Sequence, residues 1–143
     1  MNVAIVQCAT PEAYFEKVQT GVELTQRYAQ RQGYDYLFFD HMPFEMTKHV
    51  SWYKLKLVQQ CFEGYDWLFW LDADTVIMDH NRRLEEFLNT EKDFVFSHGI
   101  IGKVCAGVWF TRTTDRAKEQ LNRWFDGIEG PQGWLWEEFA VNA

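Results

Sequence analysis

Short apolar runs alternate with longer amphipathic segments along the first half of the chain. The run at 3–8, VAIVQC, contains no charge and predicts a buried strand, and the amphipathic segment at 10–33 predicts a helix. A second apolar run, YDYLFF at 34–39, predicts the next strand. The same order repeats, with a helix expected at 51–64 and a strand, WLFWL, at 67–71. Because parallel neighbours need a long crossover connection, two such units predict an α/β fold built on a parallel sheet.

The residues at the ends of these helices support the assignment. Thr10 can cap the first helix, Pro11 suits its first position, and Glu12 complements the helix dipole. Gly33 can end the first helix and Gly64 the second, because glycine adopts the left-handed conformation that often follows a last helical turn.

The second half of the chain predicts shorter elements around the same sheet. These are a short helix at 82–88, strands at 93–97 and 106–111, a helix with Ala117, Leu121, Trp124 and Phe125 on one face, and a last helical candidate at 134–143. Repeats, low-complexity tracts and linkers are absent, so the sequence predicts one domain over residues 1–143.

Composition narrows the class of protein. Of the 143 residues, 47% are hydrophobic and 17% aromatic, which predicts a packed interior rather than disorder. The net charge of -7 argues against a nucleic-acid partner, which requires a field of basic side chains. Cys8, Cys61 and Cys105 lack metal-binding spacing and are expected as reduced thiols. No signal peptide or membrane span is visible, so we expect a cytoplasmic protein.

Two aspartates follow the third predicted strand directly, in the sequence WLFWLDADTVIMD. Ligands of open α/β sheets bind at the carboxyl ends of the strands, where Asp72 and Asp74 fall. If this segment stays extended, both carboxylates point to one side and Ala73 leaves the approach uncrowded. Such a pair suits Mg²⁺ or Mn²⁺, which prefer oxygen ligands and keep positions open for phosphates. Alternatively, Asp72 only ends the strand and Asp74 or Asp79 caps the next helix.

Three stretches resemble a known family. The stretch 51–79, SWYKLKLVQQCFEGYDWLFWLDADTVIMD, is similar to the Trp-x-Lys helix, apolar strand and DxD of metal-dependent GT-A glycosyltransferases, in particular galactosyl, mannosyl and xyloglucan xylosyltransferases. The stretch 105–125 resembles that family's later glycine-bearing strand and tryptophan-bearing helix, and EEFAVN at 137–142 resembles an element of glycogenin-like enzymes. The resemblance implies a GT-A, Rossmann-like sheet with helices on both faces, in a minimal or truncated version.

The resemblance also implies site residues for a nucleotide-sugar donor, with UDP-sugars favoured and GDP-sugars possible. The donor-binding residues would be Val6, Gln7, Cys8, Ala9, Lys54, Asp72, Ala73 and Gly107. The first strand and its loop would hold the nucleoside, Lys54 would lie near the diphosphate, and Gly107 would let the sugar approach the backbone. Mn²⁺ or Mg²⁺ would be held by Asp72 and Asp74, and Asp72 could face the ribose instead.

The implied reaction is transfer of a sugar to a hydroxyl of a glycan or other acceptor, with retention of configuration. The metal would act as a Lewis acid on the departing diphosphate, and Glu137 or Glu138 would stabilise the oxocarbenium-like carbon or orient the acceptor. Two positions depart from the family pattern, Cys105 for asparagine and Glu138 for glutamine. The resemblance also implies a late histidine as a further metal ligand, and no histidine follows His98 in this sequence. His98 could approach the metal from its loop, or it could be an ordinary surface or turn residue.

Two other functions fit parts of the pattern. DADTV resembles the signature of haloacid-dehalogenase phosphatases, in which the first aspartate is the nucleophile, although that signature normally opens its domain. A non-catalytic module that binds nucleotide sugars is also compatible with the sequence. The pattern leaves the oligomeric state open, since the many aromatic residues could cover a partner as readily as a ligand.

Overall fold

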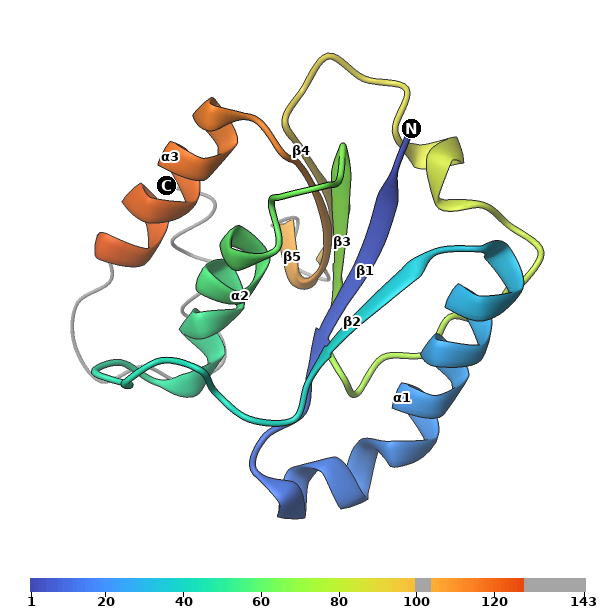
Figure 1. Ribbon diagram of the computed structural model, residues 1–143, viewed down its shortest axis with the longest axis horizontal. Coiled ribbons are helices and arrows are strands. Elements are labelled where there is room, and N and C mark those ends of the chain that lie inside the picture. Colours follow the sequence, from blue (N-terminus) through green and yellow to red (C-terminus); the bar gives the residue numbers. More distant parts are fainter. Residues whose placement is uncertain (100–103, 128–143) are drawn as a thin grey trace.

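The computed structural model describes residues 1–99 and 104–127 (Figure 1). In chain order, its elements are β1 (Val3–Cys8), α1 (Glu12–Gln32), β2 (Asp35–Phe39), the 3-10 helix η1 (Val50–Tyr53), α2 (Lys54–Gln60), β3 (Trp67–Leu71), the 3-10 helix η2 (Leu84–Phe87), β4 (Phe94–His98), β5 (Val104–Arg112) and α3 (Asp115–Asp126). The α/β fold is confirmed, and all five expected strands are present. The helical candidate at 134–143 lies outside the described residues.

The five strands form one mixed sheet in the order β2-β1-β3-β5-β4. The strands β2, β1 and β3 are mutually parallel, as the repeated strand-helix-strand order predicts. The strands β5 and β4 join as an antiparallel extension, in which Leu71 at the end of β3 lies opposite Val108 near the middle of β5. The carboxyl ends of β1, β2 and β3 therefore share one edge of the sheet, and residues early in β5 reach that same edge.

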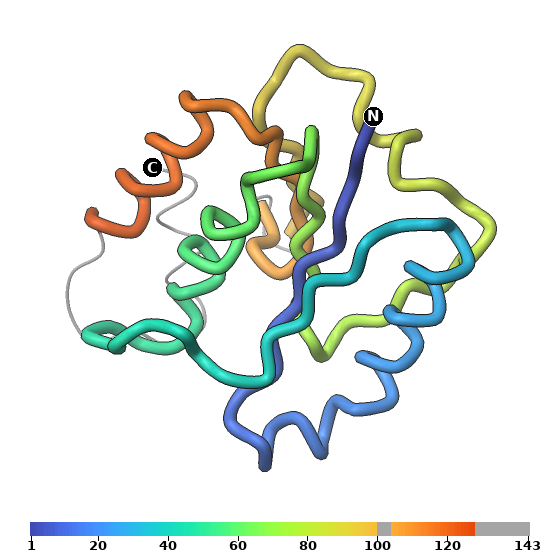
Figure 2. Tube along the Cα trace, viewed as in Figure 1, coloured from blue at the N-terminus to red at the C-terminus, as the bar shows by residue number. Residues whose placement is uncertain are grey.

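Helices cover both faces of this sheet, as expected (Figure 1). Side chains alternate along β1, so that Val3 and Ile5 pack with Tyr28 of α1 while Ala4 and Val6 pack on the α2 side. The tube in Figure 2 shows α2 and α3 side by side on that second face, with α1 on the other. The strands β1 and β3 are thus buried along nearly their whole length, which explains why they are almost continuously apolar.

The core contains most of the tryptophans. Four of them are almost fully buried, namely Trp52, Trp67, Trp70 and Trp109. Trp124 of α3 is half-buried and packs against the same cluster. These five tryptophans therefore belong to the packed interior that the aromatic composition predicts. Within the described ranges, no helix is both long enough and apolar enough to cross a membrane.

The helix ends differ in part from expectation. Pro11 takes the N-cap position of α1, and no side chain caps this helix, so the capping role predicted for Thr10 is wrong. Gly33 does end α1, in the left-handed conformation with φ of 77°. The helix expected at 51–64 is shorter and begins as the 3-10 turn η1, and α2 ends before Cys61. The short helix expected at 82–88 is the 3-10 turn η2.

Candidate functional site

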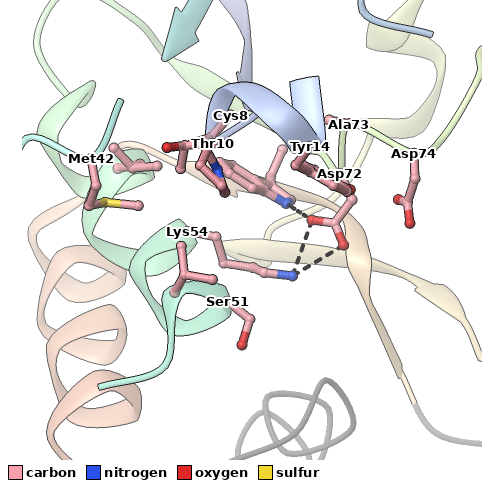
Figure 3. A pocket seen from close by; sticks show the side chains of 13 residues that line it. Cys8, Thr10, Tyr14, Met42, Ser51, Lys54, Asp72, Ala73 and Asp74 are labelled. Carbon is pink, nitrogen blue, oxygen red and sulfur yellow. Dashed lines mark hydrogen bonds and ion pairs between the residues drawn. The ribbon is translucent and has the colours of Figure 1, made fainter. Parts of the chain in front are cut away.

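A cavity of about 410 Å³ opens at the edge of the sheet where β1, β2 and β3 end (Figure 3). Loops after all three of these strands contribute to it, as do the first turn of α1 and the segment η1–α2. Its lining residues are Cys8, Thr10, Pro11, Tyr14, Met42, Val50, Ser51, Lys54, Leu57, Trp70, Asp72, Ala73 and Asp74. The cavity therefore lies where ligands of α/β sheets bind, and it is large enough for a ligand of small-molecule size.

Asp72 is held by several groups at the floor of this cavity. The Lys54 ammonium contacts both carboxylate oxygens, at 3.1 Å from Oδ1 and 3.3 Å from Oδ2, and also donates to the Ala106 carbonyl at 3.2 Å. The Trp70 indole Nε1–H donates to Asp72 Oδ1 at 2.7 Å. Lys54 is only 6% exposed, so this is a largely buried ion pair in which both partners have further hydrogen bonds.

The expected extended geometry of residues 72–74 is wrong. Strand β3 ends at Leu71, and residues 72–75 form a turn in which the Thr75 amide and hydroxyl both donate to the Asp72 carbonyl. Figure 3 shows the Asp72 carboxylate turned toward Lys54, while that of Asp74 lies apart from this pair. Asp74 is exposed, and among the described residues its carboxylate has no hydrogen-bond or ion-pair partner. The two carboxylates border one cavity but differ in their surroundings.

The first strand contributes one residue to the lining of the cavity, and its other candidate residues are buried behind the lining. Cys8 faces the cavity, whereas Val6, Gln7 and Ala9 are almost completely buried. The Gln7 amide donates to the Asp72 carbonyl at 3.4 Å and accepts from the Tyr36 hydroxyl at 2.6 Å. Gln7 thus supports the turn at Asp72 from behind, and direct donor contact by Val6, Gln7 and Ala9 stays a prediction.

The structure shows what a side chain at Gly107 would meet. The Gly107 carbonyl accepts from the Asp72 amide at 2.8 Å, which joins β5 to the end of β3. A Cβ at this position would lie 3.0 Å from Asp72 Oδ2. The absence of a side chain therefore leaves room for the Asp72 carboxylate, and the expected approach of a sugar to Gly107 stays a prediction.

Burial and, after it, nearby carboxylates raise the pKa values of two cavity residues. Burial raises the pKa of the Cys8 thiol to about 11, with further contributions from Asp40 and Asp72. The pKa of Tyr14 is raised by burial and then by Asp74 and Asp72, so both carboxylates act on the same phenol. Both side chains therefore stay neutral near pH 7, and the cavity carries the charges of Lys54 and two carboxylates.

These groups fit a hard divalent cation. Asp74 offers a carboxylate that nothing in the described part of the chain engages, and Asp72 retains lone pairs beside its contacts with Lys54 and Trp70. His98 is exposed at the end of β4, where it lies opposite Val104, and it does not line the cavity. Within residues 1–99 and 104–127, no three histidine, cysteine or acidic side chains gather as a metal site. Glu137 and Glu138 lie outside the described residues.

Sequence reasoning missed several lining residues. Tyr14 lies on the first turn of α1, Met42 follows β2, and Ser51 belongs to η1. The rule that ligands bind beyond the carboxyl ends of strands could have suggested the first two. The contact between Trp70 and Asp72 could have been expected from strand alternation, because residues two apart lie on the same face.

Solved structures with a similar fold are glycosyltransferases. A glycosyltransferase involved in the glycosylation of the major capsid of PBCV-1 has a TM-score of 0.79 at 20% identity, covering 99% of this chain and 74% of that one. The catalytic domain of Drosophila beta1,4galactosyltransferase 7, solved in complex with xylobiose, has a TM-score of 0.58 at 16% identity, covering 99% and 60%. At these identities, the likeness shows the shared fold.

Sequence comparison agrees with the fold. The probable alpha-1,6-mannosyltransferase MNN10 of Saccharomyces cerevisiae is 32% identical over a region that covers 47% of this chain and 19% of that protein. The chain thus spans about a fifth of the length of this curated relative. The pattern of the galactosyl transferase GMA12/MNN10 family matches residues 4–95, which include Lys54, Asp72 and Asp74. The resemblance seen in the sequence is confirmed, and the chain belongs to the galactosyl transferase GMA12/MNN10 family.

Proposed function

We propose that this chain binds a nucleotide-diphosphate sugar with Mn²⁺ or Mg²⁺ and transfers the sugar to a hydroxyl of a glycan or other acceptor. Family membership supports glycosyl transfer, and the cavity beside Lys54, Asp72 and Asp74 supports the choice of donor. The observation that carries the proposal is the contrast between the two aspartates. Asp72 is held by a buried lysine, while Asp74 borders the same cavity with its carboxylate open.

The charges of the cavity support a cation-assisted diphosphate site. Lys54 pairs with Asp72, whereas the negative charge of the Asp74 carboxylate has no cation paired with it among the residues that the structure describes. That charge would repel a diphosphate, and a bound divalent cation reverses its sign. In the proposed site, Asp74 holds the metal, and Asp72 binds either the metal or a ribose hydroxyl. When bound, the metal supplies Lewis-acid stabilisation to the departing diphosphate.

The rest of the cavity would bind the nucleoside part of the donor. Tyr14 presents a half-buried aromatic ring and Met42 a flexible thioether, both of which suit a planar base. Thr10 and Ser51 add hydroxyls that can pair with polar atoms. A UDP-sugar is the favoured donor, and a GDP-sugar is the second choice. Retention of configuration, with Glu137 or Glu138 at the reacting centre, remains part of the proposal.

The proposal is tested with a panel of UDP- and GDP-sugars, with and without Mn²⁺, followed by calorimetry and assay of released nucleoside diphosphate. Asp74→Asn should weaken metal-dependent donor binding by more than about tenfold, since even outer-shell partners of metal ligands contribute about 10- to 100-fold. Asp79→Asn is the matched control, because Asp79 is exposed in the same segment and does not line the cavity. Its affinity should stay unchanged.

Three results would distinguish the alternatives. Donor binding that is independent of Mn²⁺ and equal in wild type and Asp74→Asn would refute the proposed site. Tight metal-dependent binding without turnover, even with acceptor glycans present, would support a non-catalytic binding module. Rapid hydrolysis of a generic phosphomonoester would support the phosphatase, which family membership already argues against.

A further inference from the structure

The Asp72 carboxylate is contacted by side chains of two different elements and has room beside a third. Lys54 of α2 contacts both oxygens, the Trp70 indole of β3 donates to Oδ1, and the Cα of Gly107 in β5 leaves space for Oδ2. The 2.7 Å distance from Trp70 Nε1 to Oδ1 falls within the range of charge-assisted hydrogen bonds. A carboxylate with this many partners has one preferred orientation before any ligand binds.

The Trp70 indole is itself held in place by the core. Trp70 is 4% exposed and packs in the cluster between the sheet and α2, opposite Trp109 of the neighbouring strand. Strand alternation places residues 70 and 72 on the same face, so the indole N–H reaches the carboxylate just beyond the strand end. Because an indole nitrogen can only donate a hydrogen bond, the Asp72 carboxylate is the acceptor in this contact. The Lys54 ammonium, on its flexible stem, neutralises the charge of Asp72, and the rigid Trp70 indole orients the carboxylate.

We propose that Trp70 is a positioning residue for the donor site, which acts by holding the Asp72 carboxylate in its binding orientation. This inference rests on the proposed function, because it assigns to Asp72 a contact with the bound metal or ribose. Preorganised groups bind more tightly because they lose less conformational freedom on binding. Among the described residues, loss of the indole N–H leaves Lys54 as the side chain that donates hydrogen bonds to Asp72, and it allows the carboxylate to rotate. The affinity for the nucleotide sugar should therefore fall, while the reaction of the bound nucleotide sugar changes little.

The test compares Trp70→Phe with the matched control Trp52→Phe. Trp52 is 1% exposed in the same core cluster, and its indole nitrogen has no hydrogen-bond partner among the described residues. Both variants shorten a buried aromatic side chain and remove one N–H, but only Trp70 bonds to Asp72. We expect Trp70→Phe to weaken Mn²⁺-dependent donor binding about tenfold by calorimetry, as for a hydrogen bond to a charged group. In kinetics, the donor KM should rise about tenfold with kcat within twofold, whereas Trp52→Phe should leave both within twofold.

Equal affinities for the nucleotide sugar in the two variants would overturn the positioning role, provided that the wild type binds it with Mn²⁺ and Asp74→Asn binds it more weakly. If the wild type itself shows no metal-dependent binding, the proposed function fails instead. Should Trp70→Phe not fold, the indole proton resonance of Trp70 in the wild-type chain supplies the test. This proton should exchange slowly with water, shift in Asp72→Asn, and stay protected with UDP-sugar and Mg²⁺ bound, Mg²⁺ being used here because it is diamagnetic. Fast exchange, or no response to Asp72→Asn, would refute the inference.

Discussion

Replacing Lys54 by methionine tests how strongly the buried ion pair stabilises the fold. Methionine keeps the unbranched stem and most of its packing but removes the ammonium that contacts both Asp72 oxygens and the Ala106 carbonyl. Breaking a fully buried pair costs about 3–5 kcal/mol. The Asp72 side chain is 32% exposed and keeps its bond from Trp70, so water and the indole compensate in part. We therefore expect a loss of about 2 kcal/mol.

Urea unfolding followed by tryptophan fluorescence measures this loss, because Trp52, Trp67 and Trp109 lie buried in the core. For a chain of this size, about 2 kcal/mol lowers Tm by roughly 6–8 °C. The double variant Lys54→Met, Asp72→Asn removes both charges, so it should be more stable than the sum of the two single losses predicts by at least about 1 kcal/mol. A loss below about 0.5 kcal/mol in Lys54→Met, or strict additivity in the double variant, would refute this account of the pair.

Two further predictions concern neighbours of the same carboxylate. Gly107→Ala places a methyl group 3.0 Å from Asp72 Oδ2, so the carboxylate must move; calorimetry should show metal-dependent donor binding weakened by several-fold, with a stability loss of about 1 kcal/mol. Unchanged binding would show that the carboxylate can shift without consequence. Burial and two nearby carboxylates raise the pKa of Cys8 to about 11. The rate at which Cys8 reacts with an alkylating agent should follow this pKa, because the thiolate is the form of cysteine that reacts. With Cys61 and Cys105 replaced by serine, the rate of alkylation by iodoacetamide should still rise about tenfold between pH 9 and pH 10, whereas a rate that levels off by about pH 10 would contradict the raised pKa.

Most of the fold could be predicted from local patterns. The apolar runs became β1, β2 and β3, and their order along the chain predicted that they are parallel, because helical crossovers connect them. The helix ends were less predictable. Pro11 starts α1 without a side-chain cap, and η1 replaces the first turn of the second helix. Such ends depend on contacts with the rest of the fold as much as on local preference.

The candidate site was predictable in composition but not in geometry. Lys54, Asp72 and Asp74 were expected and do border one cavity. The pairing of β5 with β3 brings Gly107 against Asp72, and residues 35 positions apart in sequence cannot be paired by a local pattern. The sequence pattern predicted correctly that β3 ends at Leu71. It did not show that residues 72–75 then form a turn.

The sequence by itself determined which segments are buried, the parallel order of the first three strands, and the end of the sheet at which acidic residues gather. These properties follow from hydrophobic periodicity and chain connectivity, which are local. The tertiary structure alone decided that Lys54 and Trp70 hold Asp72 while Asp74 stays open. Those contacts join helix, strand and turn, and they form only when packing of the core fixes the distances between these elements.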